Sequence, residues 1–367
     1  MPDRDCVLVA AGGTGGHLFP AESLADALAR RNVPVELATD DRAVKYGAKF
    51  RARAMHAIPA ATPTGGGIAS KLSAGLVLAR GTLAAIGIVR RVRPMAVVGF
   101  GGYPTVPPVL AGVLLGVPTI LHEQNAVMGR ANRFLAGRVD AIATGFETLG
   151  GVSPAILAKA RHTGNPVRQA VVDAAALPYP ACDGSRLNLL VTGGSQGARV
   201  MSDIVPAAME LIGADMRARI GLVQQARGED EQRVRDIYAR LGLAAEIAPF
   251  FADLPARIGQ AHLVIARSGA STVSELAVIG RPSILVPFPH AIDQDQAANA
   301  AHLAATGAAL VVAQTQFTPQ FLANALVEAL ADPQSLTKRA EAARSAGIAD
   351  AADRLAELVL EVAARKR

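Results

Sequence analysis

A histidine stands at the start of a predicted helix, directly after a glycine-rich turn. The turn, Gly12–His17 (GGTGGH), follows the apolar run Cys6–Ala11, which predicts a strand that leads into a helix. Such a turn aims backbone N–H groups and the positive helix end at one point, which suits an anion such as phosphate. The same helix end disfavours imidazolium, so a neutral His17 can take a proton from a substrate hydroxyl. The alternative is a histidine that only hydrogen-bonds to backbone, and the phosphate-type turn beside it favours the catalytic role.

A second turn of the same kind lies about 180 residues further on. Gly193–Ala198 (GGSQGA) follows the apolar run Leu187–Thr192 and precedes another predicted helix. One such turn is a weak signal. Two of them, at the same place in two similar halves, predict an α/β protein with two Rossmann-like, doubly wound parallel-sheet domains that face each other across a cleft.

Arg267–Glu275 follows the predicted strand Leu263–Ala266. Ser271 or Thr272 is placed to cap the next helix, whose free N–H groups would meet a diphosphate. Two roles remain open for Glu275, which either closes a capping box with Thr272 or accepts hydrogen bonds from ribose hydroxyls.

Two further polar segments also follow apolar strands. His290–Gln296 is rich in amides and carboxylates, which fits recognition of a sugar. The alternative is a helix capped by Asp293 or Asp295. Glu123 and Asn125 follow the strand Pro118–Leu121, and their alternative is a turn that satisfies its own backbone. In an open α/β sheet, ligands bind beyond the carboxyl ends of the strands, where all these segments fall.

The chain has 367 residues, which is natural for two domains. We predict a first domain over residues 1–165, a second over residues 166–347, and a last helix over about 348–367 that packs back on the first. The first predicted helix runs from about Pro20 to Arg31, and a long one spans about Ser70 to Val92.

Charge and cysteine content narrow the class of protein. The two cysteines, Cys6 and Cys182, have no metal-site spacing and indicate a reducing cytoplasm, and no signal peptide precedes the first strand. No motif supplies a His/Cys cluster with metal-site spacing, so a site without metal or cofactor is the simpler prediction. Residues 1–165 hold 18 Lys/Arg against 10 Asp/Glu, whereas residues 166–367 hold 19 against 21. The basic half attracts anionic lipid or a phosphorylated substrate, and few aromatics accompany it to stack nucleic-acid bases.

These motifs, with Gly101–Tyr103, His122–Asn125 and Thr163–Arg168, occur in one order and spacing over nearly the whole chain. Together they resemble the bacterial N-acetylglucosaminyltransferases of peptidoglycan synthesis, in glycosyltransferase family 28. The resemblance implies a GT-B fold and transfer of GlcNAc, with inversion, from UDP-GlcNAc to the C4 hydroxyl of MurNAc in undecaprenyl-diphospho-MurNAc-pentapeptide (lipid I). The products are lipid II and UDP.

The resemblance also implies residue roles. His17 is the implied base, Glu123 joins it as a catalytic candidate, and Gly15, Gly102 and Tyr103 hold the acceptor diphosphate. Phe251 contacts uracil through its backbone. The other implied substrate-binding residues are Thr14, Gly15, Gly16, Asn125, Arg168, Ser195, Ala270, Ser271, Thr272, Val273, Ser274, Glu275 and Gln296. Ser271 stands where an apolar residue is common in the family, which leaves its contact with the donor open. Asp295 stands where a second glutamine can occur, which leaves the sugar contacts of its loop open.

A lipid acceptor changes the interpretation of the basic half. Residues Lys71–Arg93 mix Leu and Arg without an acid, so we expect them to dock peripherally on the cytoplasmic face of the anionic inner membrane. Cell-wall and division proteins are possible partners, and nucleic acid is not. Two other functions stay open: another UDP-sugar enzyme of this fold, such as a glycolipid synthase or a UDP-GlcNAc epimerase, and a non-catalytic nucleotide-sugar sensor.

Overall fold

The chain forms two compact α/β units. The computed structural model describes residues 5–12, 15–40, 50–59 and 68–366. Unit 1 comprises Met1–Arg168 with Ala349–Arg367, and unit 2 comprises Gln169–Ile348. Each unit is built on one parallel sheet, which confirms the predicted fold class. The division falls after Arg168, where the sequence predicts it after residue 165.

The sheet of unit 1 has seven strands in the order β3-β2-β1-β4-β5-β6-β7, and every neighbouring pair is parallel. The strand order reverses at β1, which lies between β2 and β4, so the switch point of this sheet is at β1 and β4. The strands are β1 (Val7–Ala10), β2 (Val35–Thr39), β3 (Ala54–Ala57), β4 (Ala96–Gly99), β5 (Thr119–Glu123), β6 (Ala141–Thr144) and β7 (Ala160–His162).

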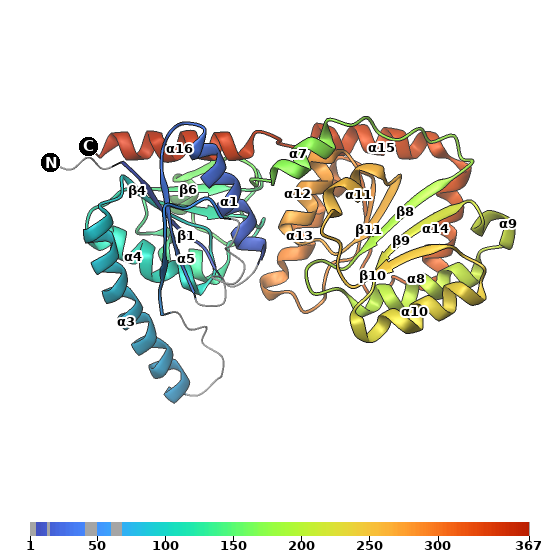
Figure 1. Cartoon of the computed structure of the whole chain (residues 1–367), viewed down its shortest axis with the longest axis horizontal. Helices are drawn as coiled ribbons and strands as arrows, with labels where there is room; N and C mark the ends of the chain where they lie inside the picture. The colour runs from blue at the N-terminus through green and yellow to red at the C-terminus, as the bar shows by residue number, and fades with distance from the viewer. Residues whose placement is uncertain (1–4, 13–14, 41–49, 60–67, 367) are drawn as a thin grey trace. The chain divides into compact units, whose positions relative to one another are not determined.

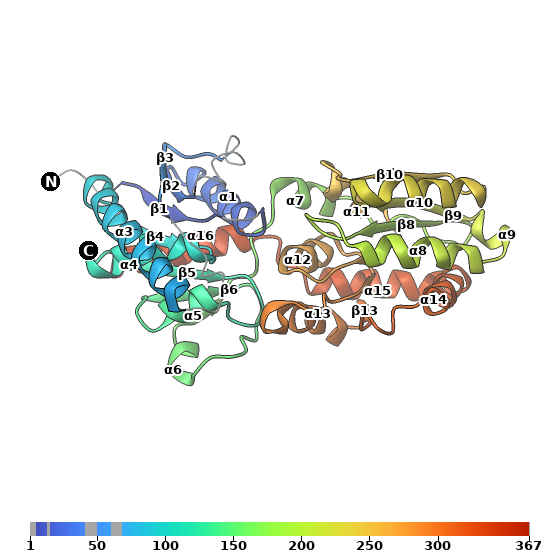
Figure 2. The ribbon, with the colours of Figure 1, turned by 90° about the horizontal axis from the view of Figure 1, so that it is seen from below.

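Both faces of this sheet are covered by helices. Val7 and Val9 of β1 pack into the core beside α1 and α16, and the alternate residues Leu8 and Ala10 pack into the core beside α3, α4 and α5. Figure 2 views the unit from the side of α3, α4 and α5. The helices are α1 (Gly15–Ala29), α3 (Ile68–Val92), η2 (Tyr103–Thr105), α4 (Val106–Leu114), α5 (Arg130–Ala136), α6 (Pro154–Leu157) and α16 (Ala351–Arg365).

Helix α1 begins earlier than the sequence predicts. It starts at Gly15 and contains Pro20, which we had placed at its first turn. A proline at the sixth position cannot donate to the Gly16 carbonyl oxygen, and its ring crowds that carbonyl, so the helix includes Pro20 at a cost in free energy. His17 therefore lies within the first turn of the helix and not ahead of it.

The C-terminal helix α16 packs on unit 1. It contacts α1, β4, β5 and β6, and Figure 1 shows it along α1. The apolar face includes Leu355 and Val359, both fully buried. Asp353 pairs with Arg30 at 3.0 Å and with Arg31 at 2.5 Å. Burial of the apolar face holds this helix, and the ion pairs lie at its exposed rim.

Unit 2 repeats the architecture with six parallel strands in the order β10-β9-β8-β11-β12-β13. Its switch point lies at β8 and β11, in the same place as in unit 1. The strands are β8 (Leu187–Thr192), β9 (Ile220–Gln225), β10 (Ala245–Ala248), β11 (Leu263–Ala266), β12 (Ser283–Leu285) and β13 (Ala309–Val311).

The core of unit 2 packs alternate residues of β8 against α8, α10 and α14. Helices α7, α11, α12 and α15 contact one another in a second group. The helices are α7 (Gln169–Ala175), α8 (Arg199–Leu211), α9 (Ala214–Arg217), α10 (Gly228–Arg240), α11 (Leu254–Gln260), α12 (Ala270–Ile279), η3 (Ile292–Gln294), α13 (Asp295–Ala305), α14 (Pro319–Ala331) and α15 (Pro333–Ser345).

Candidate active site

In unit 1, the candidate residues gather at the carboxyl ends of three neighbouring strands. β1, β4 and β5 lie side by side in the sheet. The segment after β1 carries His17, the segment after β4 carries Gly101 and Gly102, and β5 ends in Glu123 followed by Gln124. Three segments that lie far apart in the sequence therefore meet at one sheet edge, at the switch point where ligands of such folds bind.

His17 is held as a neutral imidazole. Burial of the ring lowers its pKa from 6.5, and a hydrogen bond to the backbone of Phe100 partly opposes this effect. The Gln124 side-chain amide lies 3.0 Å from His17 Nδ1. Gly15 and Gly16 form the start of the helix that carries the ring, whereas Thr14 lies outside the described residues. A neutral ring is the form that can accept a proton.

Two glycines lie against the imidazole. Gly101 and Gly102 both have positive φ, of 86° and 75°. A Cβ on Gly101 would lie 3.3 Å from His17 Cε1, and one on Gly102 would lie 3.5 Å from Nε2. Side chains are therefore disfavoured here by both backbone conformation and space. Gly102 and the partly buried Tyr103 then open the short helix η2.

Glu123 organises the segment after β5. Its carboxylate accepts hydrogen bonds from the backbone N–H groups of Asn125 and Gly129, both at 3.0 Å, and from Asn132 Nδ2 at 2.8 Å. The side chain is buried, and this burial raises the pKa of the carboxyl against the effect of the three donors. The geometry matches the alternative that the sequence left open, a turn that satisfies its own backbone.

The last segment of unit 1 adds an amide and a guanidinium. Asn165 Nδ2 donates to the carbonyl oxygen of Gln124 at 2.9 Å. The guanidinium of Arg168 stacks on the Phe19 ring, 4.3 Å from its centroid. Phe19 lies in the first turns of α1, two residues after His17. Arg168 therefore lies near the start of α1, where a cation complements a bound anion.

In unit 2, three neighbouring strands again end in candidate segments. β8 leads to the turn Gly193–Gly197, β11 leads to Arg267 and α12, and β12 leads to the loop before Gln296. A Cβ on Gly193 would lie 2.1 Å from Ala198 N, so this position admits glycine alone. Ser195 is exposed at the tip of the turn.

Gln225, at the end of β9, holds the glycine turn. Its Oε1 accepts from Gly193 N at 3.0 Å and from Thr192 Oγ1 at 2.9 Å. Its Nε2 donates to the carbonyl oxygens of Gly194 at 3.0 Å and Pro249 at 3.1 Å. This buried residue was not among those predicted from the sequence. The signal for it is its position: Gln225 ends the strand β9, which pairs with β8, and β8 leads into the glycine turn.

Helix α12 begins one turn earlier than a Ser271 or Thr272 cap requires. Its N-cap is Gly269, no side chain caps it, and Thr272 lies inside the helix. The predicted caps and the capping box are therefore wrong, because the glycine turn into the helix leaves the first N–H groups without a side-chain acceptor. Ala270 and Val273 are buried, Ser271, Thr272 and Ser274 are partly exposed, and Glu275 is buried one turn into the helix.

Arg267 and Ser268 connect α12 to the neighbouring loops. The buried Arg267 guanidinium donates to the carbonyl oxygens of Val286 at 2.9 Å and Pro287 at 3.1 Å. Ser268 Oγ donates to the carbonyl oxygen of Gln296 at 2.8 Å. Gln296 Oε1 accepts from Phe288 N at 2.9 Å, so its Nε2 is the half of the amide directed to a further acceptor.

The loop before α13 is strained. Asp293 and Gln294 have φ of 56° and 54°, a conformation that costs free energy for residues other than glycine. The N-cap is Gln294 with no side-chain cap, so the predicted caps at Asp293 and Asp295 are wrong. Asp295 Oδ1 is buried without a hydrogen-bond partner among the described residues, and burial raises the pKa of this carboxyl. Strain and an unpaired oxygen in one loop are typical of a ligand-binding segment.

Phe251 follows β10 and is buried, with the Arg257 guanidinium 4.3 Å from its ring centroid. Its ring is thus packed, which leaves its backbone as the part able to contact a base. Among the described residues, no group of three or more His, Cys, Asp or Glu side chains is placed to hold a metal ion.

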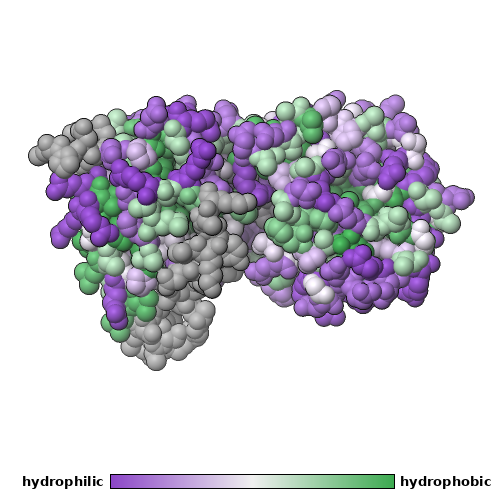
Figure 3. All heavy atoms as spheres, in the orientation of Figure 1, coloured by the Kyte–Doolittle hydropathy of each residue, from purple (hydrophilic) through white to green (hydrophobic). Residues whose placement is uncertain are grey.

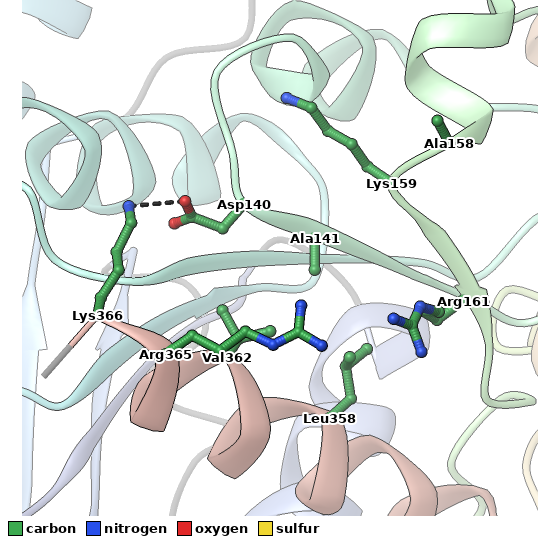
Figure 4. Close-up of a pocket in the computed structure, with 9 residues that line it drawn as sticks. All are labelled: Asp140, Ala141, Ala158, Lys159, Arg161, Leu358, Val362, Arg365 and Lys366. Atoms are coloured by element: carbon green, nitrogen blue, oxygen red, sulfur yellow. Dashed lines mark ion pairs between the residues drawn. The ribbon is translucent and has the colours of Figure 1, made fainter.

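A pocket of about 270 Å³ in unit 1 lies away from this edge (Figure 4). It is formed where β6 and β7 begin and where α16 ends, at the opposite ends of the strands from His17. Asp140 accepts from Lys366 at 2.6 Å and from Thr119 N at 2.8 Å, and Lys159 donates to the Val139 carbonyl at 2.9 Å. The Asp140–Lys366 pair joins the end of α16 to the sheet, whereas Lys159 bonds to the segment after α5.

Comparison with known proteins places the chain among sugar-transferring enzymes. The Glycosyltransferase family 28 N-terminal domain matches residues 7–144, and the Glycosyltransferase family 28 C-terminal domain matches residues 188–355. The UDP-N-acetylglucosamine–N-acetylmuramyl-(pentapeptide) pyrophosphoryl-undecaprenol N-acetylglucosamine transferase of Methylorubrum populi is 60% identical over 360 residues, which cover 98% of this chain and 97% of that protein. The transferase of the same name from Nitrobacter hamburgensis is 52% identical over 365 residues, or 99% and 98% of the two chains.

Solved structures agree with the sequence matches. The crystal structure of Acinetobacter baumannii MurG aligns with a TM-score of 0.79 at 28% identity and covers 97% of this chain and 99% of that one. A UDP-GlcNAc 2-epimerase from Neisseria meningitidis bound to UDP-GlcNAc aligns with a TM-score of 0.66 at 14% identity, over 97% and 99% of the chains. The second likeness concerns the fold alone.

Proposed function

Because the chain belongs to glycosyltransferase family 28, we propose that it is the N-acetylglucosaminyltransferase that converts lipid I and UDP-GlcNAc into lipid II and UDP. The transfer places GlcNAc on the C4 hydroxyl of the MurNAc unit of undecaprenyl-diphospho-MurNAc-pentapeptide. The names of relatives that are 52–60% identical over nearly the full chain support this substrate pair. The observation that carries the chemistry is the neutral His17 at the switch point of unit 1.

His17 is the general base of this proposal. The acceptor hydroxyl oxygen forms a bond to the anomeric carbon, the bond from that carbon to the UDP oxygen breaks, and the hydroxyl proton passes to the imidazole. A single displacement of this kind inverts the anomeric centre. The lowered pKa keeps the ring free to accept the proton near neutral pH. No metal or cofactor is part of the proposal.

Unit 2 binds the donor in this proposal. The N–H groups of the first turn of α12, on Ala270, Ser271 and Thr272, face the diphosphate without a competing side-chain cap, whereas Val273 N–H already donates to the Gly269 carbonyl oxygen. Val273 and Ser274 line the same stretch of helix in this proposal. Glu275 accepts from the ribose hydroxyls, Ser195 contacts the diphosphate, and the Phe251 backbone contacts uracil. Arg168, which belongs to unit 1, is a further diphosphate ligand in this proposal. Gln296 uses its Nε2 on a sugar hydroxyl, since Phe288 N already occupies its Oε1.

Unit 1 binds the acceptor. Gly15, Gly102 and Tyr103 follow neighbouring strands and offer backbone donors to the lipid diphosphate. Thr14 and Gly16 contact the donor in this proposal, and Thr14 lies outside the described residues. Asn125 contacts the sugars. We assign Glu123 to positioning this segment, because its carboxylate already binds three donors.

We further propose that α3 docks unit 1 on the cytoplasmic face of the inner membrane. The exposed face of this helix carries Leu76 and Leu83, 68% and 69% exposed, together with Arg80, Arg90 and Arg91. Figure 3 shows apolar and charged side chains interleaved at this part of unit 1. Such a mixture suits the headgroup layer of anionic lipid. Among the described residues, no helix is long and apolar enough to span a bilayer.

Product analysis tests the substrate pair. Purified protein is supplied with UDP-GlcNAc and either a lipid I analogue or diacylglycerol. We expect a disaccharide product and UDP from the lipid I analogue alone. A glycosylated diacylglycerol would support the glycolipid synthase, release of UDP and an epimerised sugar without acceptor would support the epimerase, and UDP-GlcNAc binding without turnover would support a sensor.

A further inference from the structure

The His17 ring has a side-chain hydrogen-bond partner whose chemistry decides which ring nitrogen can act as base. The Gln124 side-chain amide lies 3.0 Å from Nδ1, with its nitrogen Nε2 as the nearer atom. The neutral imidazole carries one proton, either on Nδ1 or on Nε2, and only the nitrogen without it can accept another. The partner at Nδ1 therefore selects the tautomer and, with it, the nitrogen that faces the acceptor hydroxyl.

An amide can serve either tautomer. Its NH₂ group would donate to a bare Nδ1 and leave the proton on Nε2, whereas its carbonyl oxygen would accept from Nδ1–H and leave Nε2 bare. The two orientations have the same shape. In the first orientation both nitrogens are occupied, so the ring cannot act as a base without breaking a hydrogen bond.

The base role of His17 requires the second orientation, in which the amide is turned so that Oε1 faces Nδ1–H and the ring Nε2 is left without a proton. The ring lies between two glycines. A Cβ on Gly101 would lie 3.3 Å from Cε1 and 3.5 Å from Nδ1, and a Cβ on Gly102 would lie 3.5 Å from Cδ2 and from Nε2. The ring also hydrogen-bonds to the backbone of Phe100, which directly precedes Gly101.

We propose that Gln124 is a positioning residue that presents Oε1 to Nδ1–H of His17 and thereby leaves the Nε2 lone pair for the acceptor hydroxyl. This inference rests on the base role given to His17 in the proposed function. Gln124 orients the imidazole and fixes its tautomer, as the aspartate of a Ser-His-Asp triad does, but it carries no charge.

The protein holds Gln124 from both sides. Asn165 Nδ2 donates to its backbone carbonyl oxygen at 2.9 Å, and the preceding residue, Glu123, is fixed by three donors. Asn165 is itself tightly packed, since a Cβ on Gly145 would lie 2.1 Å from its Oδ1. The amide therefore sits on a rigid segment, as a group that sets the angle of a catalytic ring must.

A neutral partner is also the useful one. A carboxylate at this place would stabilise the imidazolium and raise the pKa of the ring, so that the base would be protonated over more of the neutral range. The amide orients the ring and leaves it unprotonated. This explains why a glutamine, and not a glutamate, follows Glu123 here.

The tautomer is measured first, in wild-type protein labelled with ¹⁵N-histidine. Long-range ¹H–¹⁵N spectra distinguish Nδ1–H from Nε2–H, and comparison with His17→Ala identifies the His17 signals. We expect the Nδ1–H form. A wild-type ring with its proton on Nε2 would overturn the proposal, whatever the variants do.

Two substitutions then test the consequence. Gln124→Met keeps the size and removes the acceptor; we expect kcat to fall on the order of 10- to 100-fold with KM for UDP-GlcNAc within about twofold, and the His17 signals to show mixed tautomers. Gln124→Glu should restore the tautomer and move the acid limb of the kcat profile to higher pH by about one unit. Gln320→Met, an exposed glutamine on α14, is the matched control.

The outcomes separate the two levels of inference. Turnover by His17→Ala near the wild-type rate would remove His17 as base, and with it the proposed mechanism. A strong loss in His17→Ala together with unchanged kcat and pH profile in both Gln124 variants would overturn the role of Gln124 alone. If Gln124→Met does not fold, the wild-type tautomer and the Gln124→Glu pH profile still decide.

Discussion

In each unit a helix follows the strand at the switch point of the sheet, and the two units carry different side chains at that edge. In unit 1, the edge after β1, β4 and β5 holds titratable groups, namely His17, His122 and Glu123, and burial disfavours the charged form of each. In unit 2, the edge after β8, β11 and β12 holds the guanidinium of Arg267, amides such as Gln225, and the carboxyls of Glu275 and Asp295. Proton transfer needs a group that can change its charge, whereas a diphosphate needs donors that do not. Both units therefore share a fold whose helix N-termini can bind an anion. In the proposed function the side chains of unit 1 transfer the proton, and those of unit 2 bind the diphosphate.

The largest effect is expected where the comparison is most direct, at the two turns. His17→Ala should lower kcat on the order of 10²-fold or more and leave UDP affinity unchanged, because a lost general base affects only the chemical step. Ser195→Ala in unit 2 should do the reverse and raise KM for UDP-GlcNAc by about tenfold with little change in kcat. Steady-state kinetics and UDP titration measure both. Equal losses of kcat in the two variants would erase the distinction between the units.

Acid should destabilise unit 1 through His122. Burial lowers the pKa of this side chain from 6.5 to about 4. Between these values the unfolded chain binds a proton that the folded chain does not, so the free energy of unfolding falls as pH decreases, by about 3 kcal/mol at pH 4. His122→Phe should remove this loss, since Phe100 already packs on the ring at 5.2 Å. Hydrogen exchange followed by mass spectrometry reports each unit separately, and an unchanged pH dependence in unit 1 of the variant would contradict the assignment.

The turn of unit 2 should depend on Gln225. Gln225→Leu leaves Gly193 N–H and the carbonyl oxygens of Gly194 and Pro249 without their partner. Buried groups left unpaired cost about 1–3 kcal/mol each, less where water can enter. We therefore expect a loss of about 2 kcal/mol in unfolding free energy, with weaker UDP binding and an unchanged His17 tautomer. Denaturant titration and UDP titration measure the first two, and a shift in the His17 signals would show that the two edges are not independent.

The smallest effect is expected at the rim of α16. Asp353→Asn removes the charge that pairs with Arg30 and Arg31. Exposed pairs contribute about 0–1 kcal/mol, and salt screens them. Val359→Ala, which opens the buried face of the same helix, should cost about 1–3 kcal/mol. Denaturant titration at low and high salt compares the two, and a larger loss for Asp353→Asn would show that the ion pairs hold the helix.

The sequence predicted the class of fold well because its signals are local. Apolar runs followed by glycine turns fixed β1 and β8, and their repetition predicted two parallel sheets. The errors arose where a tertiary contact outweighed a local preference. Pro20 was expected at the start of α1 and lies inside it, and Thr272 was expected to cap α12 and lies within it.

The site was predicted in part, for a related reason. His17, Glu123 and Gln296 were predicted as site residues because each follows an apolar strand, and the structure has them at the carboxyl edges of their sheets, where their roles stay predictions. Gln124 and Gln225 were not predicted because their partners lie far away in the chain. Gln124 is 107 positions from His17, and Gln225 is 32 positions from Gly193, so no short spacing in the sequence links them. The sequence left two roles open for Glu275, a capping box with Thr272 or hydrogen bonds to ribose hydroxyls. Because α12 begins at Ala270, the capping box is excluded, and the ribose contact stays a prediction.

The amino-acid sequence by itself determined which strands form, where each glycine turn falls and that a histidine follows the first of them, since backbone conformation and apolar periodicity act over a few neighbouring residues. Only the tertiary structure decided the strand order, and the strand order sets Gln124 against His17 and Gln225 against Gly193. Hydrogen bonds between distant segments depend on which strands are neighbours, and that is settled by the packing of the whole sheet.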